Sequence, residues 1–139
     1  IKSFSMTGQR RDLNREKFKS ENLSAVLNNP ESNANKNLKY LRNAMDVRSE
    51  LKQFHPCSQM NCLSKGRSDI VVIKRGIGPG SVFAIHNMTE NKINYQLNDN
   101  DLPKIIDNDF NTHDFLTSTK YNCKNISLDP FQVIWLSAL

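Results

Sequence analysis

The sequence predicts an α+β fold in which two N-terminal helices precede a small antiparallel β-sandwich. Apolar residues recur at helical spacing before Pro56 and gather in short β-branched runs after it. The chain has 139 residues, of which 37% are hydrophobic. This suits one small domain with a helical extension, and it is far too short for a complete (β/α)₈ barrel. We therefore expect a helical region over 1–55 and a β domain over 56–139.

Two helices are expected in the first region. The first runs from an N-cap at Ser20 to Asn28, because serine is a favoured capping residue. The second starts near Ser32 or Asn33 and runs to about Phe54, where His55–Pro56 ends it, since the residue before a proline leaves the helical region. The residues that follow helical spacing are Leu38, Leu41, Met45, Val47–Arg48, Leu51 and Phe54.

Short strands are expected after Pro56. Ile70–Ile73 and Val82–Ile85 are branched apolar runs, and the glycine-rich stretch 76–80 between them indicates a hairpin loop. A phosphate-binding loop would lead from a strand into a helix, so we do not assign that function to it. Residues 93–97 alternate as in a half-buried strand. The stretch 131–136 is apolar on both faces, which predicts a central strand with its tryptophan in the core.

The formal charge of +5 lies wholly in the first region, which carries eleven Lys and Arg against six Asp and Glu. The basic cluster at 10–19 is compatible with nucleic-acid binding, because basic clusters gain affinity by releasing phosphate counterions. However, the cluster has few aromatic residues, and it contains Asp12 and Glu16, which can pair with its arginines. We expect no nucleic-acid partner.

The three cysteines, Cys57, Cys62 and Cys123, form no dense disulfide framework. Their odd number favours a reducing, cytoplasmic compartment and buried or inert thiols. The spacing of His55, Cys57 and Cys62 is not a zinc pattern, and no second pair completes four ligands, so we expect no metal and no cofactor. No apolar run approaches the roughly 20 residues of a spanning helix, so we expect no membrane contact.

Four stretches of the sequence share their order and residues with motifs of a known enzyme family. They are 7–15 (Thr-Gly-Gln-Arg-Arg-Asp-Leu-Asn-Arg), 47–56, 82–87 with its final His-Asn, and 128–136 (Leu-Asp-Pro-Phe-Gln-Val-Ile-Trp-Leu). Together they resemble the C-terminal part of the sucrose-phosphorylase-like branch of the α-amylase superfamily. In order, they correspond there to the loop after the last barrel strand, the end of the last barrel helix, a strand of the C-terminal domain and its closing strand.

The resemblance implies that the chain is the tail of a (β/α)₈ barrel followed by the C-terminal β domain. Enzymes of this branch act on sucrose or another α-glucoside by double displacement with retention, using two carboxylates about 5–5.5 Å apart. In the family both carboxylates lie upstream of this segment. We therefore expect no catalytic residue here, an inactive isolated chain, and the remainder of the barrel as its partner.

One substrate-binding residue can be carried over by the resemblance. Arg11 matches the arginine that helps to hold the bound glucosyl unit, for which a planar guanidinium with five donors is well suited. Alternatively, Arg11 only ties the loop to the barrel. Glu16 differs from the residue that many relatives have at this position, so the resemblance does not specify the acceptor of the glucosyl group.

Two other readings of the sequence remain open. A free-standing carbohydrate-binding β-sandwich would need exposed coplanar aromatic residues. A homodimer through the helical region would cover the stripe at Leu38, Leu41, Met45 and Leu51, because large exposed apolar patches usually mark interfaces.

Overall fold

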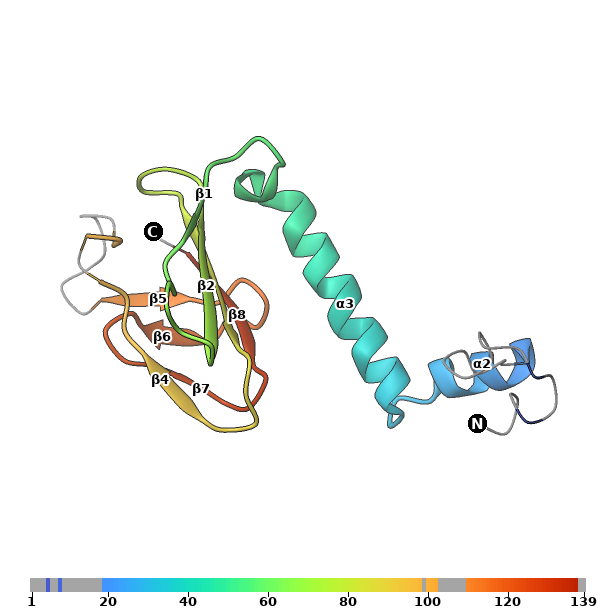
Figure 1. Ribbon diagram of the computed structural model, residues 1–139. Coiled ribbons are helices and arrows are strands. Elements are labelled where there is room, and N and C mark those ends of the chain that lie inside the picture. Colours follow the sequence, from blue (N-terminus) through green and yellow to red (C-terminus); the bar gives the residue numbers. More distant parts are fainter. Residues whose placement is uncertain (1–4, 6–7, 9–18, 99, 103–109, 138–139) are drawn as a thin grey trace. The chain divides into compact units, whose positions relative to one another are not determined.

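The computed structural model describes Ser5, Gly8 and residues 19–98, 100–102 and 110–137. It divides into two compact units, Ile1–Arg42 and Asn43–Leu139, which we describe separately. The first unit contains α2 (Ser20–Asn28) and the start of α3 (Asn33–Glu50). The second contains the end of α3, the 3₁₀ turn η2 (Lys52–Phe54) and all the strands (Figure 1). Helices followed by antiparallel sheets confirm the predicted α+β class.

In the first unit, the expected N-cap of α2 is wrong by one residue. Lys19 is the extended residue before the helix, and no side chain caps it, whereas Ser20 is already helical. The capping serine of this unit is Ser32. Its hydroxyl oxygen accepts the N–H of Asn35 at 3.1 Å and donates to the carbonyl oxygen of Val26 at 2.6 Å. Ser32 therefore joins the start of α3 to the end of α2.

In the second unit, α3 ends earlier than expected. Glu50 is its last residue, Leu51 is extended, and η2 follows. The sequence pattern ran on to Phe54 because helical spacing does not reveal a one-residue break. Instead of continuing the helix, Leu51 turns the chain toward the sheet, where the carbonyl of Gln53 accepts a hydrogen bond from Arg75 at 3.0 Å.

The main sheet has four antiparallel strands in the order β1-β2-β3-β8. They are β1 (Met60–Cys62), β2 (Ile70–Arg75), β3 (Val82–Asn87) and β8 (Val133–Ser137). The predicted hairpin between β2 and β3 is confirmed, with Ile73 opposite Ala84. Its loop begins at Gly76, whose φ of +85° favours glycine.

Two short antiparallel pairs form the second layer: β4 (Ile93–Tyr95) with β7 (Ile126–Leu128), and β5 (Asn111–His113) with β6 (Lys120–Asn122). The predicted strand at 93–97 is thus confirmed over its first three residues. The core cluster comprises Ile70, Val72, Phe83, Ile85, Leu97, Leu102, Cys123, Ile126, Leu128, Ile134 and Leu136. It joins one face of the main sheet to the smaller pairs, as a sandwich requires.

The expectation that the last strand is central is wrong, because β8 is an edge strand of the main sheet. Its free edge is covered by a turn instead of by another strand. Phe115 N–H donates to the carbonyl of Trp135 at 2.8 Å, and the carboxylate of Asp114 accepts the N–H of Trp135 at 2.7 Å. Apolar character on both faces therefore did not distinguish a central strand from a covered edge.

Among the described residues, no helix is long and apolar enough to cross a membrane.

Candidate functional site

The one substrate-binding residue that the sequence predicts, Arg11, lies outside the described residues. So do most of the basic cluster at 10–19 and the loop residues 103–109. The contribution of Arg11 to a sugar site therefore remains a prediction. The site built below comes from the second unit alone.

The main sheet has an outer face that points away from the core cluster. Cross-strand pairing places Ile73, Ala84 and Trp135 side by side in one row of this face. His86 forms the next row with Val71 and Val133, and the β1 residues Met60 and Cys62 extend the face at its edge. We call this set of eight side chains the outer face.

The segment after α3 lies against part of the outer face. The ring of Phe54 packs against Trp135, with ring centres 4.6 Å apart and planes at 44°. The Arg75 guanidinium fixes the segment by donating to the carbonyls of Gln53 and His55, at 3.0 and 2.7 Å. Trp135 is half-buried here, so the expectation of a core tryptophan is wrong. Its ring lies on the opposite side of the sheet from the core cluster.

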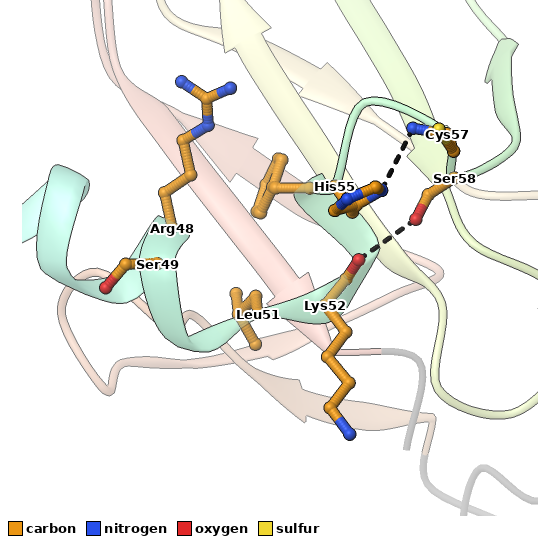
Figure 2. Close-up of a pocket in the computed structure, with 8 residues that line it drawn as sticks. Arg48, Ser49, Leu51, Lys52, His55, Cys57 and Ser58 are labelled. Atoms are coloured by element: carbon orange, nitrogen blue, oxygen red, sulfur yellow. Dashed lines mark hydrogen bonds between the residues drawn. The ribbon is translucent and has the colours of Figure 1, made fainter.

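Two adjoining hollows flank this contact and share Arg48 and Phe54. The first, about 590 Å³, is formed by the end of α3 and the turn that follows (Figure 2). Within it, Ser58 donates to the carbonyl of Lys52 at 3.0 Å, and His55 Nδ1 accepts the N–H of Cys57 at 3.2 Å. In Figure 2 the Arg48 and Lys52 side chains extend to opposite sides. They do not converge on one anion.

The second hollow, about 470 Å³, opens onto the outer face. Its apolar walls come from Phe54, Pro56, Met60, Ile73, Ala84 and Trp135, and its nitrogen-bearing side chains are Arg48, Arg75 and His86. Burial lowers the pKa of His86, so its imidazole is neutral at pH 7. No carboxylate is among the described residues that line either hollow.

The described linings of these hollows combine apolar side chains with the cationic side chains of Arg48, Lys52 and Arg75. Paired carboxylates, the groups that glycoside chemistry uses, are missing from their described linings. Within the described part of the chain, no group of three or more His, Cys, Asp or Glu side chains could hold a metal ion. The cationic and apolar lining suits a partner that is apolar and negatively charged.

The sequence suggested buried or inert thiols, and the structure shows one buried and two exposed thiols. None of the three forms a disulfide; Cys57 and Cys62 are exposed, and Cys123 is buried. Cys62 lies opposite Ile73 and therefore on the outer face. Spacing alone could not reveal this exposure, because β1 is a short edge strand.

The His-Asn ending of β3 has a structural basis. Asn87 is buried, and its amide donates to the carbonyls of Asn91 and Asp129 at 2.7 and 2.8 Å. Its side-chain oxygen accepts both the N–H and the hydroxyl of Thr89 at 2.9 Å. All its hydrogen-bonding capacity is therefore used in joining the loops after β3 and β7.

Sequence reasoning missed Asp114, Arg75 and Arg48. Asp114 is only 1% exposed, and it holds the turn that covers the edge of β8. No local pattern marks it, because its partners lie both beside it and 21 residues away. The signal for Arg75 is a charged residue that directly follows an apolar run. Arg48 was placed at helical spacing near the end of the second helix, without a binding role.

No family model matches the chain. No curated protein matches it either. Among solved structures, it is similar to AmyP in complex with maltose, with a TM-score of 0.58 and 17% identity over 77% of this chain and 21% of AmyP. It is also similar to trehalose-6-phosphate hydrolase (TreA) of Bacillus licheniformis, with a TM-score of 0.54 and 18% identity over 82% of this chain and 20% of TreA.

These similarities show that the chain has the fold of a segment of AmyP and TreA. The chain spans about a fifth of the length of each of these proteins.

Proposed function

We propose that the chain is the C-terminal part of a retaining enzyme of the α-amylase superfamily that acts on α-glucosides. The observation that carries the proposal is the shared fold over about four fifths of this chain, matched to a fifth of AmyP and of TreA. AmyP is described in complex with maltose, and TreA is a hydrolase of a phosphorylated disaccharide. The four sequence motifs, in their family order, support the same assignment.

In this function the chain supplies structure and one sugar contact. The catalytic carboxylates belong to the preceding barrel, and the β domain packs against that barrel. The family motifs favour a sucrose-phosphorylase-like enzyme within the superfamily, with sucrose or another α-glucoside as donor. Cysteines that form no disulfide are typical of a reducing compartment, so our proposal includes a cytoplasmic location.

The test compares the isolated chain with the longer polypeptide encoded in frame upstream of Ile1. We expect the longer polypeptide to release glucose, or glucose 1-phosphate when phosphate is present, from sucrose or maltose. The purified 139-residue chain should release neither. Active-site-dependent turnover by the isolated chain, or an upstream region without an α-glucoside-active domain, contradicts the proposal.

Arg11→Ala in the longer polypeptide tests the proposed sugar contact. Charged hydrogen bonds contribute about 1.5–3 kcal/mol each, so kcat/KM should fall at least roughly tenfold. Arg11→Lys should restore little, because an ammonium cannot reproduce a planar fork. Near-normal kcat/KM for Arg11→Ala would remove Arg11 from the sugar site.

The exposed helix residues fit the proposed packing against a barrel. Leu41 is 58% exposed and Met45 is 68% exposed, although helical spacing places both on the predicted stripe. In the isolated chain we expect these side chains to favour self-association through the helical region. A constant monomer mass by light scattering over a wide concentration range would contradict this expectation.

A carbohydrate-binding module is the weaker candidate. It would need an exposed aromatic platform, and the single tryptophan of the chain is half-buried against Phe54. The exposed aromatic side chains Tyr40, Phe110 and Phe131 come from three separate segments of the described chain.

A further inference from the structure

The two edges of the main sheet differ in how they are covered. The strand order β1-β2-β3-β8 places β1 at one edge and β8 at the other. At β8, the turn at Asp114 and Phe115 bonds both the N–H and the carbonyl of Trp135. All three residues of β1 are exposed, and no described strand pairs with its far side. Within the described part of the chain, the sheet is therefore closed at β8 and open at β1.

The hydrogen bonds on either side of β1 show how its backbone alternates. Just before β1, the carbonyl of Gln59 accepts the N–H of Gly76 at 2.9 Å. Just after β1, Leu63 N–H donates to the carbonyl of Val72 at 2.8 Å. Both bonds continue the register of β1 and β2, and bonded and non-bonded pairs alternate along an antiparallel ladder. Residues 59, 61 and 63 therefore turn their backbone groups toward β2.

Met60 and Cys62 consequently turn their N–H and C=O groups to the open edge. None of these groups forms a hydrogen bond with a described backbone group. Both side chains lie on the outer face, and that of Met60 belongs to a residue that is 61% exposed. β1 contains no charged residue and no proline, which are the residues that usually protect an edge. Such an edge is a template for pairing with another strand.

A second copy of β1 matches the hydrogen-bonding pattern of this edge. In an antiparallel pair centred on Asn61, Met60 of each copy lies opposite Cys62 of the other. Because both residues present an N–H and a C=O, each opposed pair exchanges both of its hydrogen bonds. Asn61 lies opposite itself, and its exposed amide can donate as well as accept. The arrangement is isologous, as a two-fold dimer requires.

We propose that two copies of this chain associate by pairing their β1 edges, which joins their four-stranded main sheets into one continuous sheet. β1 is uncharged, so the pairing brings no like charges of the strand into opposition. The contact is short, so the dimer is weak and forms at high protein concentration. It lies in the second unit, separate from the self-association expected of the helical region, and it does not depend on the reaction that the longer polypeptide catalyses.

Disulfide trapping at Asn61 tests the pairing. Residues opposite each other in a non-hydrogen-bonded pair have Cα atoms about 4.5 Å apart, a separation that a disulfide can span. Asn61→Cys is made in a chain that carries Cys57→Ser and Cys62→Ser, which remove the exposed native thiols. Mild oxidation of the folded chain with copper phenanthroline should give a covalent dimer on non-reducing gels. The matched control is Lys120→Cys in the same background, an exposed position on β6 that should give several-fold less dimer.

Met60→Pro tests the backbone bonds of the pairing. The substitution removes an N–H that points to the open edge and leaves the bonds between β1 and β2 in place, a position at which edge strands tolerate proline. Added to the trapping variant, it should lower the dimer yield several-fold. Met60→Ala keeps the N–H and removes the side chain, so it should retain most of the yield. Similar urea midpoints for the two variants show that Met60→Pro keeps the fold.

Leu41→Glu combined with Met45→Glu separates the β1 edge from the helical region. These substitutions place charge on the exposed helix residues and should leave the yield from Asn61→Cys unchanged.

Three results would overturn the proposal. Equal yields from Asn61→Cys and Lys120→Cys show that collision alone links the chains, and they leave the edge to an extended segment of another protein. A yield that Met60→Ala lowers as much as Met60→Pro does removes the backbone pairing. A yield that falls with the two helix substitutions assigns the dimer to the helical region.

Discussion

Replacing Asp114 by alanine should destabilise the β domain more than any surface change. The carboxylate is 1% exposed and accepts three hydrogen bonds, from the N–H of Trp135 at 2.7 Å, the N–H of Leu116 at 3.2 Å and the hydroxyl of Thr117 at 2.6 Å. Thr117 can turn its hydroxyl to water, but the two backbone donors lose their only acceptor in this turn. Each buried donor left unpaired costs about 1–3 kcal/mol, so we expect a loss of about 4 kcal/mol.

Urea unfolding followed by the fluorescence of the single tryptophan measures this loss. With a slope of about 2 kcal/mol/M, the midpoint of Asp114→Ala should fall by about 2 M. Asp114→Asn keeps an acceptor for both N–H groups and should lose less than half as much. The control is Asp129→Ala, which removes only an exposed ion pair with Lys92 and should change stability by less than about 1 kcal/mol. A wild-type midpoint for Asp114→Ala would refute the assignment of Asp114 as the residue that secures the edge of β8.

Three further changes have defined outcomes. Phe131 has a φ of +55° in a turn, where a side chain strains the backbone, and it is 65% exposed. Phe131→Gly should therefore stabilise the fold by about 0.5–1 kcal/mol in urea unfolding. Any destabilisation would contradict the backbone strain at this position. Burial lowers the pKa of His86 below its ordinary 6.5, so the unfolded chain binds more protons and stability should fall as the pH drops below about 6.5. His86→Gln should flatten the dependence of the unfolding free energy on pH between about pH 7 and 5.5. An unchanged slope would contradict the assignment of this dependence to His86. Asn87→Ala should lower the free energy of unfolding by about 2–4 kcal/mol, because the four hydrogen bonds of Asn87 join two loops. Thermal unfolding measures this loss, and a wild-type melting temperature would contradict that role.

The elements with strong local periodicity could be predicted from the sequence. The helices and the β2–β3 hairpin follow from apolar spacing and from the glycine-rich loop. The break at Leu51 could not be predicted from local spacing. The turn that follows it is held by Arg75, which lies more than twenty residues later in the chain and donates a hydrogen bond to the carbonyl of Gln53. The edge position of β8 was missed for a similar reason, since Asp114 and its turn cover that edge only after the chain has folded.

The candidate site could be predicted from the sequence less completely than the fold. Arg11 came from a motif, and it lies outside the described residues. The outer face, in contrast, depends on strand register. Ile73, Ala84 and Trp135 are far apart in sequence and become neighbours only when β2, β3 and β8 pair. The absence of polar alternation in β2 and β3 was the available signal that both faces of the sheet need cover.

The stereochemistry of the reaction tests the central claim most directly. Time-resolved proton NMR of an α-glucoside mixed with the longer polypeptide, the one that ends in residues 1–139, identifies the first product anomer. A retaining mechanism predicts that the α-anomer forms first and mutarotates later, with no product from the isolated chain. A β-anomer as first product, or no turnover of any α-glucoside by the longer polypeptide, would contradict the assignment of this chain to a retaining α-glucoside-active enzyme.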